Sequence, residues 1–346
     1  MEFALIIIFL ALVFDFYNGM NDAANSIATV VSTRVLTPGQ AVTWAAFFNF
    51  AAAFIFGVGV ATTIGKGIVD VSIVDNQVIF SGLIGAILLS ATATHYGMPI
   101  SVSHSIIGGY GGAGIAKAGF GAIVLSGYTK VVIFIFLAPI MGYIIALIFS
   151  VITLWIVRNK SPYKVDKYFR KLQLVSAALY SLSHGSNDAQ KTIGIIAIVL
   201  FTNGVLGSTF YIPFYAIMMS YTVIALGTLV GGWKVIKTLG MRVTKLTPFG
   251  GFSAETASGI TISLASIWGI PVSTTHTITG AIIGVGSIKG FSAVRWGVAR
   301  NILWAWILTI PLSAAFAMIT YYISQLIVKG LYSFLSSSSR IFFTLF

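Results

Sequence analysis

An aspartate lies inside an apolar segment in Gly19-Met20-Asn21-Asp22-Ala23, and Gly185-Ser186-Asn187-Asp188-Ala189 repeats the pattern about half a chain later. An aspartate at the centre of a membrane span costs roughly 2.5–3.5 kcal/mol on insertion scales. An acid kept at that cost marks a functional site by default. Because the motif occurs twice, it predicts a site built between two related halves of one fold.

The composition is typical of a helical membrane protein. Of the 346 residues, 57% are hydrophobic and 8% are charged, whereas a soluble domain carries about 25% charged residues. Apolar stretches of ~20 residues or more can cross the ~30 Å hydrocarbon core as helices. The chain contains no cysteine, which excludes disulfides and thiolate metal sites. The apolar N-terminus lacks a basic region, so we expect it to be a retained first span.

The net charge of +12 follows the loops of a membrane protein rather than a stripe for nucleic acid. Lysines and arginines gather in three short segments, which the positive-inside rule makes cytoplasmic. We therefore expect a multi-pass protein of the cell (plasma or inner) membrane that contacts the lipid bilayer and binds no nucleic acid. The segments contain Arg158, Lys160, Lys164, Lys167, Arg170 and Lys171; Lys234, Lys237, Arg242 and Lys245; and Lys289, Arg295 and Arg300.

The apolar pattern predicts an all-α polytopic membrane protein with two matching sets of membrane elements. Each set holds a span interrupted at its motif, a single span, a hairpin broken at Gly-x-Pro and a long final span. The elements are 1–33, 41–60, 78–118 and 124–157 in the first half, and 172–202, 211–232, 250–289 and 293–328 in the second. The domains are the repeats 1–157 and 172–330, a basic cytoplasmic loop at 158–171 and a C-terminal tail at 331–346.

The two broken hairpins have similar sequences. The segment 95–105, His-Tyr-Gly-Met-Pro-Ile-Ser-Val-Ser-His-Ser, aligns with 267–277, Ile-Trp-Gly-Ile-Pro-Val-Ser-Thr-Thr-His-Thr. The basic segments place the N-terminus outside and start the second half from the inside. Inverted-topology repeats with broken helices and re-entrant helical hairpins are the architecture of many secondary transporters, whose site lies at the midplane between the repeats.

Broken helices place helix N-termini inside the membrane, where their N–H groups and partial positive charge favour an anion. Serine and threonine hydroxyls beside the breaks can donate to an oxyanion. The oxygens of Asp22, Asp188 and their neighbouring asparagines suit a small cation, and Lys191 supplies one fixed positive charge. An anion and two aspartates cannot share a dry site uncompensated, so either cations enter with the anion or the aspartates carry protons.

At this point the sequence resembles the inorganic phosphate transporter (PiT) family over nearly the whole chain. Gly-Met-Asn-Asp-Ala-Ala-Asn-Ser-Ile (19–27) and Gly-Ser-Asn-Asp-Ala-Gln-Lys-Thr-Ile (185–193) are similar to its paired signature. Gly-Phe-Ser-Ala-Glu-Thr-Ala (251–257), followed by Pro-Val-Ser-Thr-Thr-His (271–276), also matches. The resemblance implies a cation-coupled phosphate symporter and maps the family's second-half glutamate onto Glu255. Asn49 stands where relatives often carry glutamate, so the acidic pair that the resemblance implies is not symmetric here.

We expect two sets of site residues, for phosphate and for Na⁺, with Na⁺ as the coupling ion and the only metal and with no cofactor. The other reading of the aspartates is helix capping, and that of the hydroxyls is satisfaction of backbone groups freed by Pro99 and Pro271. The phosphate set is Ser103, Ser105, Thr275, Thr277, Asn21, Asn187, Gln190 and Lys191. The Na⁺ set is Asp22, Asn25, Asp188, Ser101, Ser273, Thr192 and Glu255.

Histidines outside these sets have two readings each. His104 and His276 resemble a metal or catalytic pair, but the sequence offers no further histidine or cysteine at ligand spacing, so we expect them to brace neighbouring helices. His184 lies beside the second motif, where it either tunes Asp188 or serves packing.

The first functional hypothesis is a secondary active symporter that imports inorganic phosphate with Na⁺ by alternating access. A protonated phosphate can donate a hydrogen bond to an aspartate, whereas sulfate cannot, so the acidic motifs favour phosphate. Alternatives are a proton-coupled phosphate (or metal-phosphate) symporter, a sulfate symporter and, less favoured, an anion channel. The chain has no nucleophile elbow and no HExxH motif, so we expect no enzyme. The sequence leaves the oligomeric state open, a homodimer included.

Overall fold

The structure is a computed structural model that describes the backbone of residues 2–343 and the side chains as far as Gly330. Residues 344–346, the end of the expected tail, lie outside the described residues. Between residues 2 and 343 the chain forms twelve α-helices, four short 3₁₀ helices and no strand. The α-helices are α1 (Glu2–Ser32), α2 (Pro38–Ala51), α3 (Gly59–Lys66), α4 (Asn76–Tyr96), α5 (Val102–Ala118), α6 (Leu125–Val157), α7 (Pro162–Thr202), α8 (Phe214–Val230), α9 (Trp233–Arg242), α10 (Pro248–Ile267), α11 (Thr274–Ser287) and α12 (Trp296–Phe343). The 3₁₀ helices are η1 (Ala52–Phe54), η2 (Val71–Ile73), η3 (Phe120–Ala122) and η4 (Phe291–Ala293).

Several helices can cross a bilayer, which confirms the predicted all-α membrane protein. By length and composition, α1, α4, α6 and α12 qualify as 4 single spans. Two bent pairs raise the number to 6 if each pair counts as one span, namely Pro38–Phe54 with α3 at 83° and α8 with α9 at 65°. Many large apolar side chains on α6 and α12 are exposed, as expected for helices that face lipid.

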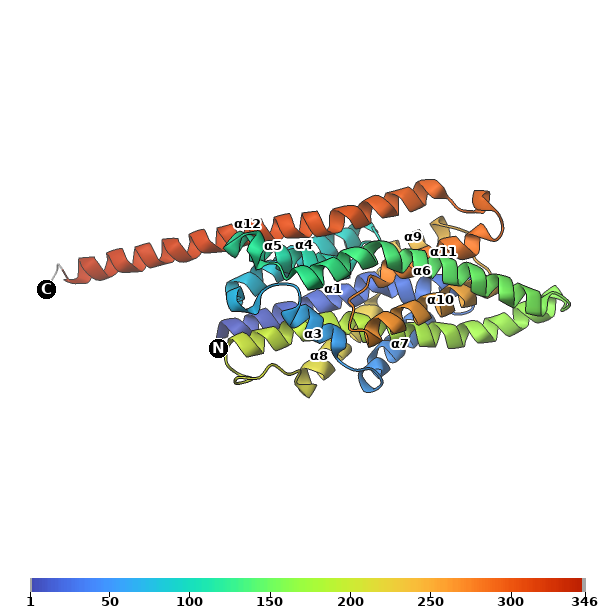
Figure 1. Cartoon of the computed structure of the whole chain (residues 1–346), viewed down its shortest axis with the longest axis horizontal. Coiled ribbons are helices and arrows are strands. Elements are labelled where there is room, and N and C mark those ends of the chain that lie inside the picture. Colours follow the sequence, from blue (N-terminus) through green and yellow to red (C-terminus); the bar gives the residue numbers. More distant parts are fainter. Residues whose placement is uncertain (1, 344–346) are drawn as a thin grey trace.

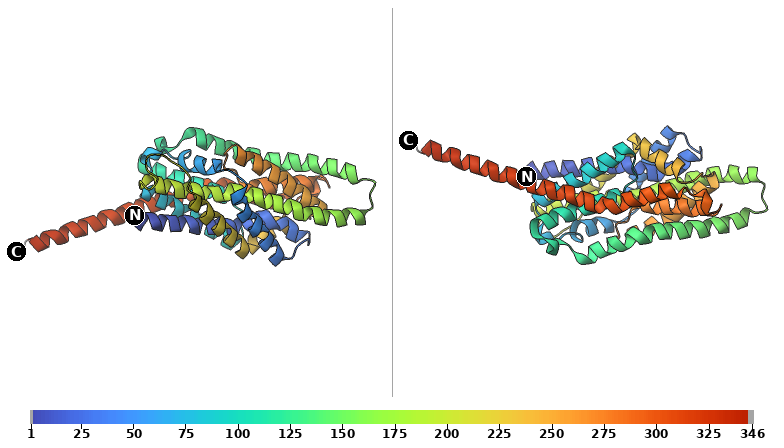
Figure 2. Two further views of the ribbon diagram at one scale, coloured as in Figure 1. Left: turned by 90° about the horizontal axis from the view of Figure 1, so that it is seen from below. Right: turned by 90° about the horizontal axis from the view of Figure 1, so that it is seen from above.

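The helices of the two halves have matching neighbours. Helix α1 packs against α8 and α9, and α7 packs against α2 and α3. Helix α5 packs against α4 and α12, and α11 packs against α10 and α6. Figure 1 shows α1 (blue) running from the end marked N toward the end where α6 and α7 (green) are joined, and α7 running back. The joined ends of α6 and α7 project beyond the other helices in Figure 2.

The interruptions that the sequence suggested within α1 and α7 are wrong, because both helices continue through their motifs. The motif glycines instead permit close helix packing. A Cβ atom on Gly19 would lie 2.2 Å from the carbonyl oxygen of Ile224 in α8. A Cβ atom on Gly185 would lie 2.6 Å from the carbonyl oxygen of Asn49 in α2. A helical glycine costs only about 1 kcal/mol, so this backbone contact can outweigh it.

The breaks expected in the two hairpins are confirmed. Gly97 ends α4 at φ +71°, and Gly269 follows α10 at φ +66°, a left-handed conformation that glycine adopts without a Cβ clash. The chain is then extended until Ser101 caps α5 and Ser273 caps α11, each by accepting the N–H three residues later at 3.2 Å. Each hairpin therefore places a helix N-terminus in the interior.

Other expected boundaries shift. The spans expected at 41–60 and 211–232 are each part of a bent pair, because α2 and α8 end before a short helix of different direction. The expected basic loop at 158–171 is short, since α7 begins at Pro162, a residue favoured at the first helical position. Helix α12 continues to Phe343, through most of the segment expected as a tail.

Substitution Gly19→Ala tests whether this glycine serves packing. We expect a loss of about 1–3 kcal/mol in stability, since the added methyl group meets rigid backbone of α8. Thermal unfolding in detergent, followed by size-exclusion chromatography, measures the change. Gly297→Ala is the control, because nothing lies within 4 Å of a Cβ atom there. Equal melting temperatures for the two variants would contradict the packing role.

Candidate functional site

The two motif aspartates meet at the first turn of α11. The Thr274 hydroxyl lies 3.3 Å from Asp22 Oδ2 and 3.1 Å from Asp188 Oδ2, and all three side chains are at most 1% exposed. A hydroxyl has one hydrogen, so it can donate to only one carboxylate at a time. The prediction that the two motifs form one site is therefore supported by their geometry: α1, α7 and one hairpin all contribute to it.

Lys191 ties this pair to both hairpins. Its ammonium group forms an ion pair with Asp188 Oδ1 one helical turn away. It also donates to Ser103 Oγ at 2.5 Å, in the first turn of α5, and to the carbonyl oxygen of Val272 at 3.3 Å, just before α11. The single fixed positive charge of the site is thus bound to one aspartate and aimed at both helix N-termini.

Asp22 has weaker compensation than Asp188. Its polar contacts are the hydroxyls of Thr274 and Thr275, at 3.3 and 3.5 Å, and within the described residues it forms no ion pair. The side-chain nitrogen of Asn25 donates to the same two hydroxyls, at 3.2 and 2.9 Å, and so orients them. Two carboxylates next to one lysine leave an excess of negative charge in a dry interior, which favours a bound cation.

The contact between His184 and Asp188 also requires a positive charge between the two side chains. The Thr228 hydroxyl donates to the carbonyl oxygen of Ile224, so it accepts from the Asn49 side-chain nitrogen at 3.0 Å. Asn49 Oδ1 consequently faces His184 Nδ1 at 3.2 Å, which places a hydrogen on Nδ1. His184 Nε2 then lies 2.9 Å from Asp188 Oδ2. These two atoms face one another favourably only with a proton or a cation between them.

The motif asparagines anchor the hairpins in equivalent ways. Asn21 donates to Thr94 Oγ1 at 2.8 Å at the end of α4, and Asn187 donates to Ser266 Oγ at 3.0 Å at the end of α10. The side-chain oxygens of both asparagines are buried without a hydrogen-bond partner among the described residues. Each amide therefore holds a hairpin through its nitrogen and keeps its oxygen available.

Four of the expected hydroxyls serve their own helices. The oxygens of Ser101 and Ser273 accept from backbone N–H groups as caps. Ser105 donates to the carbonyl oxygen of Val102 at 2.7 Å, and Thr277 donates to that of Ser273 at 2.9 Å. These hydroxyls were expected beside the aspartates but bond within the hairpins, as the alternative reading described.

Three expected residues lie outside the aspartate pair. Gln190 accepts from the N–H groups of Val60 at 2.9 Å and Ala61 at 3.2 Å, at the start of α3. Glu255 on α10 accepts from Gln173 at 3.0 Å and from Ser176, both on α7. The Thr192 hydroxyl has no hydrogen-bond partner in the described part of the chain.

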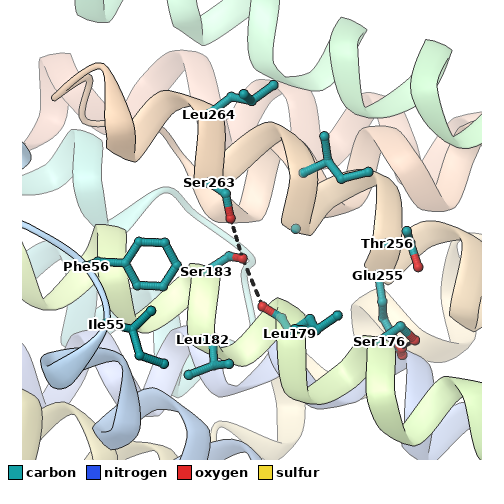
Figure 3. Close-up of a pocket in the computed structure, with 12 residues that line it drawn as sticks. Ile55, Phe56, Ser176, Leu179, Leu182, Ser183, Glu255, Thr256, Ser263 and Leu264 are labelled. Carbon is teal, nitrogen blue, oxygen red and sulfur yellow. Dashed lines mark hydrogen bonds between the residues drawn. The ribbon is translucent and has the colours of Figure 1, made fainter.

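A pocket of about 540 Å³ lies between α7 and α10, beside Glu255. Figure 3 shows Phe56, Leu182 and Leu264 around it, with Ser183 and Ser263 joined at 2.8 Å on one side. Its lining is mainly apolar and contains no lysine or arginine among its described residues. An apolar pocket of this kind does not compensate an oxyanion, so the aspartate pair remains the candidate site.

The paired histidines brace the hairpins, as expected. The rings of His104 and His276 meet edge to face, with centroids 4.7 Å apart. His276 also stacks on Trp306 at 3.8 Å, and the Trp306 indole donates to the carbonyl oxygen of Pro99 at 3.2 Å. The two hairpin tips are therefore in contact with each other through these rings.

The sequence analysis missed Thr274 and Asp15. Thr274 was missed because the alignment with the first hairpin pointed to Thr275 and Thr277. Its contact with both aspartates depends on the direction in which the first turn of α11 points this side chain. Asp15 carried a readable signal, because it precedes Asp22 by seven residues and so shares its face of the helix.

Comparisons with known proteins identify the family of this chain. The model of the phosphate transporter family matches residues 18–165 and 157–317. A "probable low-affinity inorganic phosphate transporter" of Rhizobium meliloti is 53% identical, over 93% of this chain and 96% of the relative. One of the same description from Bacillus subtilis is 42% identical, over 93% of this chain and 97% of the relative.

A solved structure described as "The sodium-dependent phosphate transporter" is similar in fold, with a TM-score of 0.85 and 30% identity. It covers 94% of this chain, and all (100%) of that structure is matched. These names describe transporters, which confirms the prediction that the chain is no enzyme. The chain is a multi-pass protein of the cell membrane, and it belongs to the phosphate transporter family.

Proposed function

We propose that the protein is a secondary active symporter that imports inorganic phosphate together with Na⁺. The observation that carries the proposal is the buried pair Asp22 and Asp188, joined by Thr274 and compensated by one lysine. A hydrophobic interior holds such an excess of negative charge only when a cation or a proton accompanies it. Coupling to a cation is therefore built into the charge balance of the site.

Na⁺ is a hard cation that takes oxygen ligands. The carboxylates of Asp22 and Asp188 and the unpartnered side-chain oxygens of Asn21 and Asn187 offer such ligands close to the motifs. The solved relative described as sodium-dependent supports Na⁺ as the coupling ion. On this proposal a bound Na⁺ neutralises the excess charge of the pair.

Phosphate would bind where Lys191, Ser103 and the first turns of α5 and α11 converge. Helix N-termini and an ammonium group favour an oxyanion. In this structure the Lys191 ammonium group forms an ion pair with Asp188. A cation that binds Asp188 instead of Lys191 would free the ammonium group for phosphate. On this proposal phosphate binds only after Na⁺, and the exchange of partners at Lys191 couples the two fluxes.

Alternating access follows from the closure of the site and from the two related halves. Asp22, Asp188, Lys191 and Thr274 are each at most 1% exposed, so bound substrate needs a conformational change to enter or leave. The matching neighbours of the two halves and the opposite directions of α1 and α7 support inverted repeats, whose rocking would open the site to each face in turn.

One observation favours a second candidate, the transport of a metal-phosphate complex. Ligand atoms of Asp22, His184 and Asp188 all lie within 4.8 Å of one another, a grouping that could hold a metal ion. Two carboxylates and an imidazole suit a divalent ion better than Na⁺ alone. On this alternative a divalent ion would bind between His184 and Asp188 and would be transported together with phosphate.

Phosphate uptake into proteoliposomes tests the function. With an inward Na⁺ gradient we expect uphill accumulation of radiolabelled phosphate, because the bound cation compensates Asp22 and Asp188. An inward H⁺ gradient, an added divalent metal and the absence of any gradient are run in parallel. Accumulation with H⁺ alone, or with the divalent metal alone, would replace Na⁺ as the coupling ion, and leakage that ignores all gradients would contradict a symporter.

Neutralising either motif aspartate should weaken the Na⁺ dependence of transport. Asp22→Asn and Asp188→Asn remove one carboxylate ligand, so we expect the Na⁺ concentration for half-maximal uptake to rise at least about tenfold. The Na⁺ dependence of uptake in proteoliposomes measures this. Asp166→Asn, which removes a half-exposed carboxylate paired with Arg170, is the control and should leave the dependence unchanged. Normal uptake by either motif variant would contradict the coupling role.

Thr274→Val removes the hydroxyl that joins the two carboxylates. Thr279→Val is a matched control on the same helix, because the buried Thr279 hydroxyl bonds only to the carbonyl oxygen of Thr275 among the described residues, at 2.7 Å. A hydrogen bond to a charged group contributes about 1.5–3 kcal/mol, against about 1 kcal/mol for a neutral one. We therefore expect Thr274→Val to impair Na⁺-driven uptake several-fold more, measured as initial rates. Equal rates for the two variants argue against the bridge.

A further inference from the structure

Asp15 is an intramembrane acid that has no role in the site proposed around Asp22 and Asp188. It lies on α1 with its side chain fully buried, at 0% exposure. Neither of its carboxylate oxygens has a hydrogen-bond partner, and it forms no ion pair, within the described part of the chain. A bare carboxylate in an apolar interior is too costly to persist, so something compensates it in the working protein.

Two polar side chains lie close enough to this carboxylate to interact with it. Asn18 lies one turn further along α1, and Thr192 faces it from α7. Both atoms of the Asn18 amide and the Thr192 hydroxyl are themselves buried without a partner among the described residues. Three neighbouring side chains from two helices thus lie close together while none of their side-chain oxygens forms a hydrogen bond of ordinary length among the described residues.

The kind of group that would satisfy these atoms can be argued from their chemistry. A proton on Asp15 would remove its charge, but the single O–H could donate to only one of the amide and hydroxyl oxygens and would leave the other without a partner. A small monovalent cation takes carboxylate, amide and hydroxyl oxygens together and removes the charge at the same time. We propose that Asp15, Asn18 and Thr192 form a further Na⁺ site between α1 and α7.

This site lies on one defined side of the aspartate pair. Asp15 precedes Asp22 by seven residues, about 10 Å along the helix axis. Thr192 follows Asp188 by four residues on α7, which runs in the opposite direction (Figure 1), so both steps lead toward the N-terminal end of α1. With the basic segments inside, that end faces outward. The inference rests on the proposed Na⁺ symport, in which the site receives Na⁺ before the aspartate pair does.

The second half has no equivalent of this site. With the motifs aligned, Ser181 corresponds to Asp15 and His184 corresponds to Asn18. The Ser181 hydroxyl donates to the carbonyl oxygen of Ala177 at 2.8 Å, so it is satisfied within α7. The site therefore adds an ion on one side only, and it gives the two halves different roles.

Na⁺ binding to the purified protein tests the site directly. Equilibrium binding of radioactive ²²Na⁺ is measured in detergent without phosphate, for the natural protein, Asp15→Asn, Thr192→Val and the control Asp70→Asn. Asp70 is exposed and has the same charge, and it follows Val69, which packs in one apolar cluster with Ala4 near the start of α1. We expect Asp15→Asn to bind one Na⁺ fewer per chain and Asp70→Asn to bind the natural number. Thr192→Val, which keeps the shape of the side chain, should bind the same number with about tenfold weaker affinity at one site.

Transport separates this inference from the proposed function. In proteoliposomes Asp15→Asn should need at least about tenfold more Na⁺ for half-maximal phosphate uptake, with an unchanged phosphate requirement at saturating Na⁺. Natural Na⁺ binding by both Asp15→Asn and Thr192→Val would overturn the site, as would a change in the pH dependence alone, which would assign a proton to Asp15. Absence of Na⁺-driven uptake by the natural protein would instead overturn the proposed function, while the binding measurement would still decide on Asp15.

Discussion

The structure depends on one electrostatic constraint, the confinement of two carboxylates and one ammonium group away from water. Lys191 satisfies Asp188, and Thr274 links both aspartates, so any movement of the first turn of α11 alters the balance of charge. Ser103 connects the same lysine to the other hairpin. Because unpaired buried charge is costly, these contacts hold four helices in register around a small polar centre.

The helices can approach this centre because their contacts are made by backbone. Gly19 and Gly185 let α1 and α7 pack against carbonyl oxygens of α8 and α2. At Gly280 of α11, an added Cβ atom would lie 2.2 Å from the carbonyl oxygen of Pro139 in α6. In a membrane, where apolar side chains gain little by leaving lipid, such close packing is a main source of helix association. The polar centre and the glycine contacts therefore depend on one another.

Much of this arrangement was readable from sequence because its signals are local. An acid in an apolar run and Gly-x-Pro between two apolar runs marked the motifs and the hairpins. The continuity of α1 was not readable, since a glycine beside a polar pair signals a break or a contact equally well, and the choice depends on Ile224 some 200 residues away. The sequence also could not show that Gln190 contacts α3 and Glu255 contacts α7 instead of the aspartate pair. Nor could it show that Thr274 joins the two aspartates. These contacts depend on which face of its helix each residue occupies and on packing between distant segments.

The packing of the hairpins has a consequence for the synthesis of the protein. Helix α5 of the first half lies against α12, with an added Cβ on Gly108 only 2.6 Å from the carbonyl oxygen of Ile310, whereas α11 lies against α6, which is made earlier. During translation the first hairpin must therefore wait, without its main neighbour, until almost the entire chain has been inserted. The second hairpin finds its neighbour at once. Maturation of the nascent chain thus ends with the docking of α12 onto the hairpin of the first half.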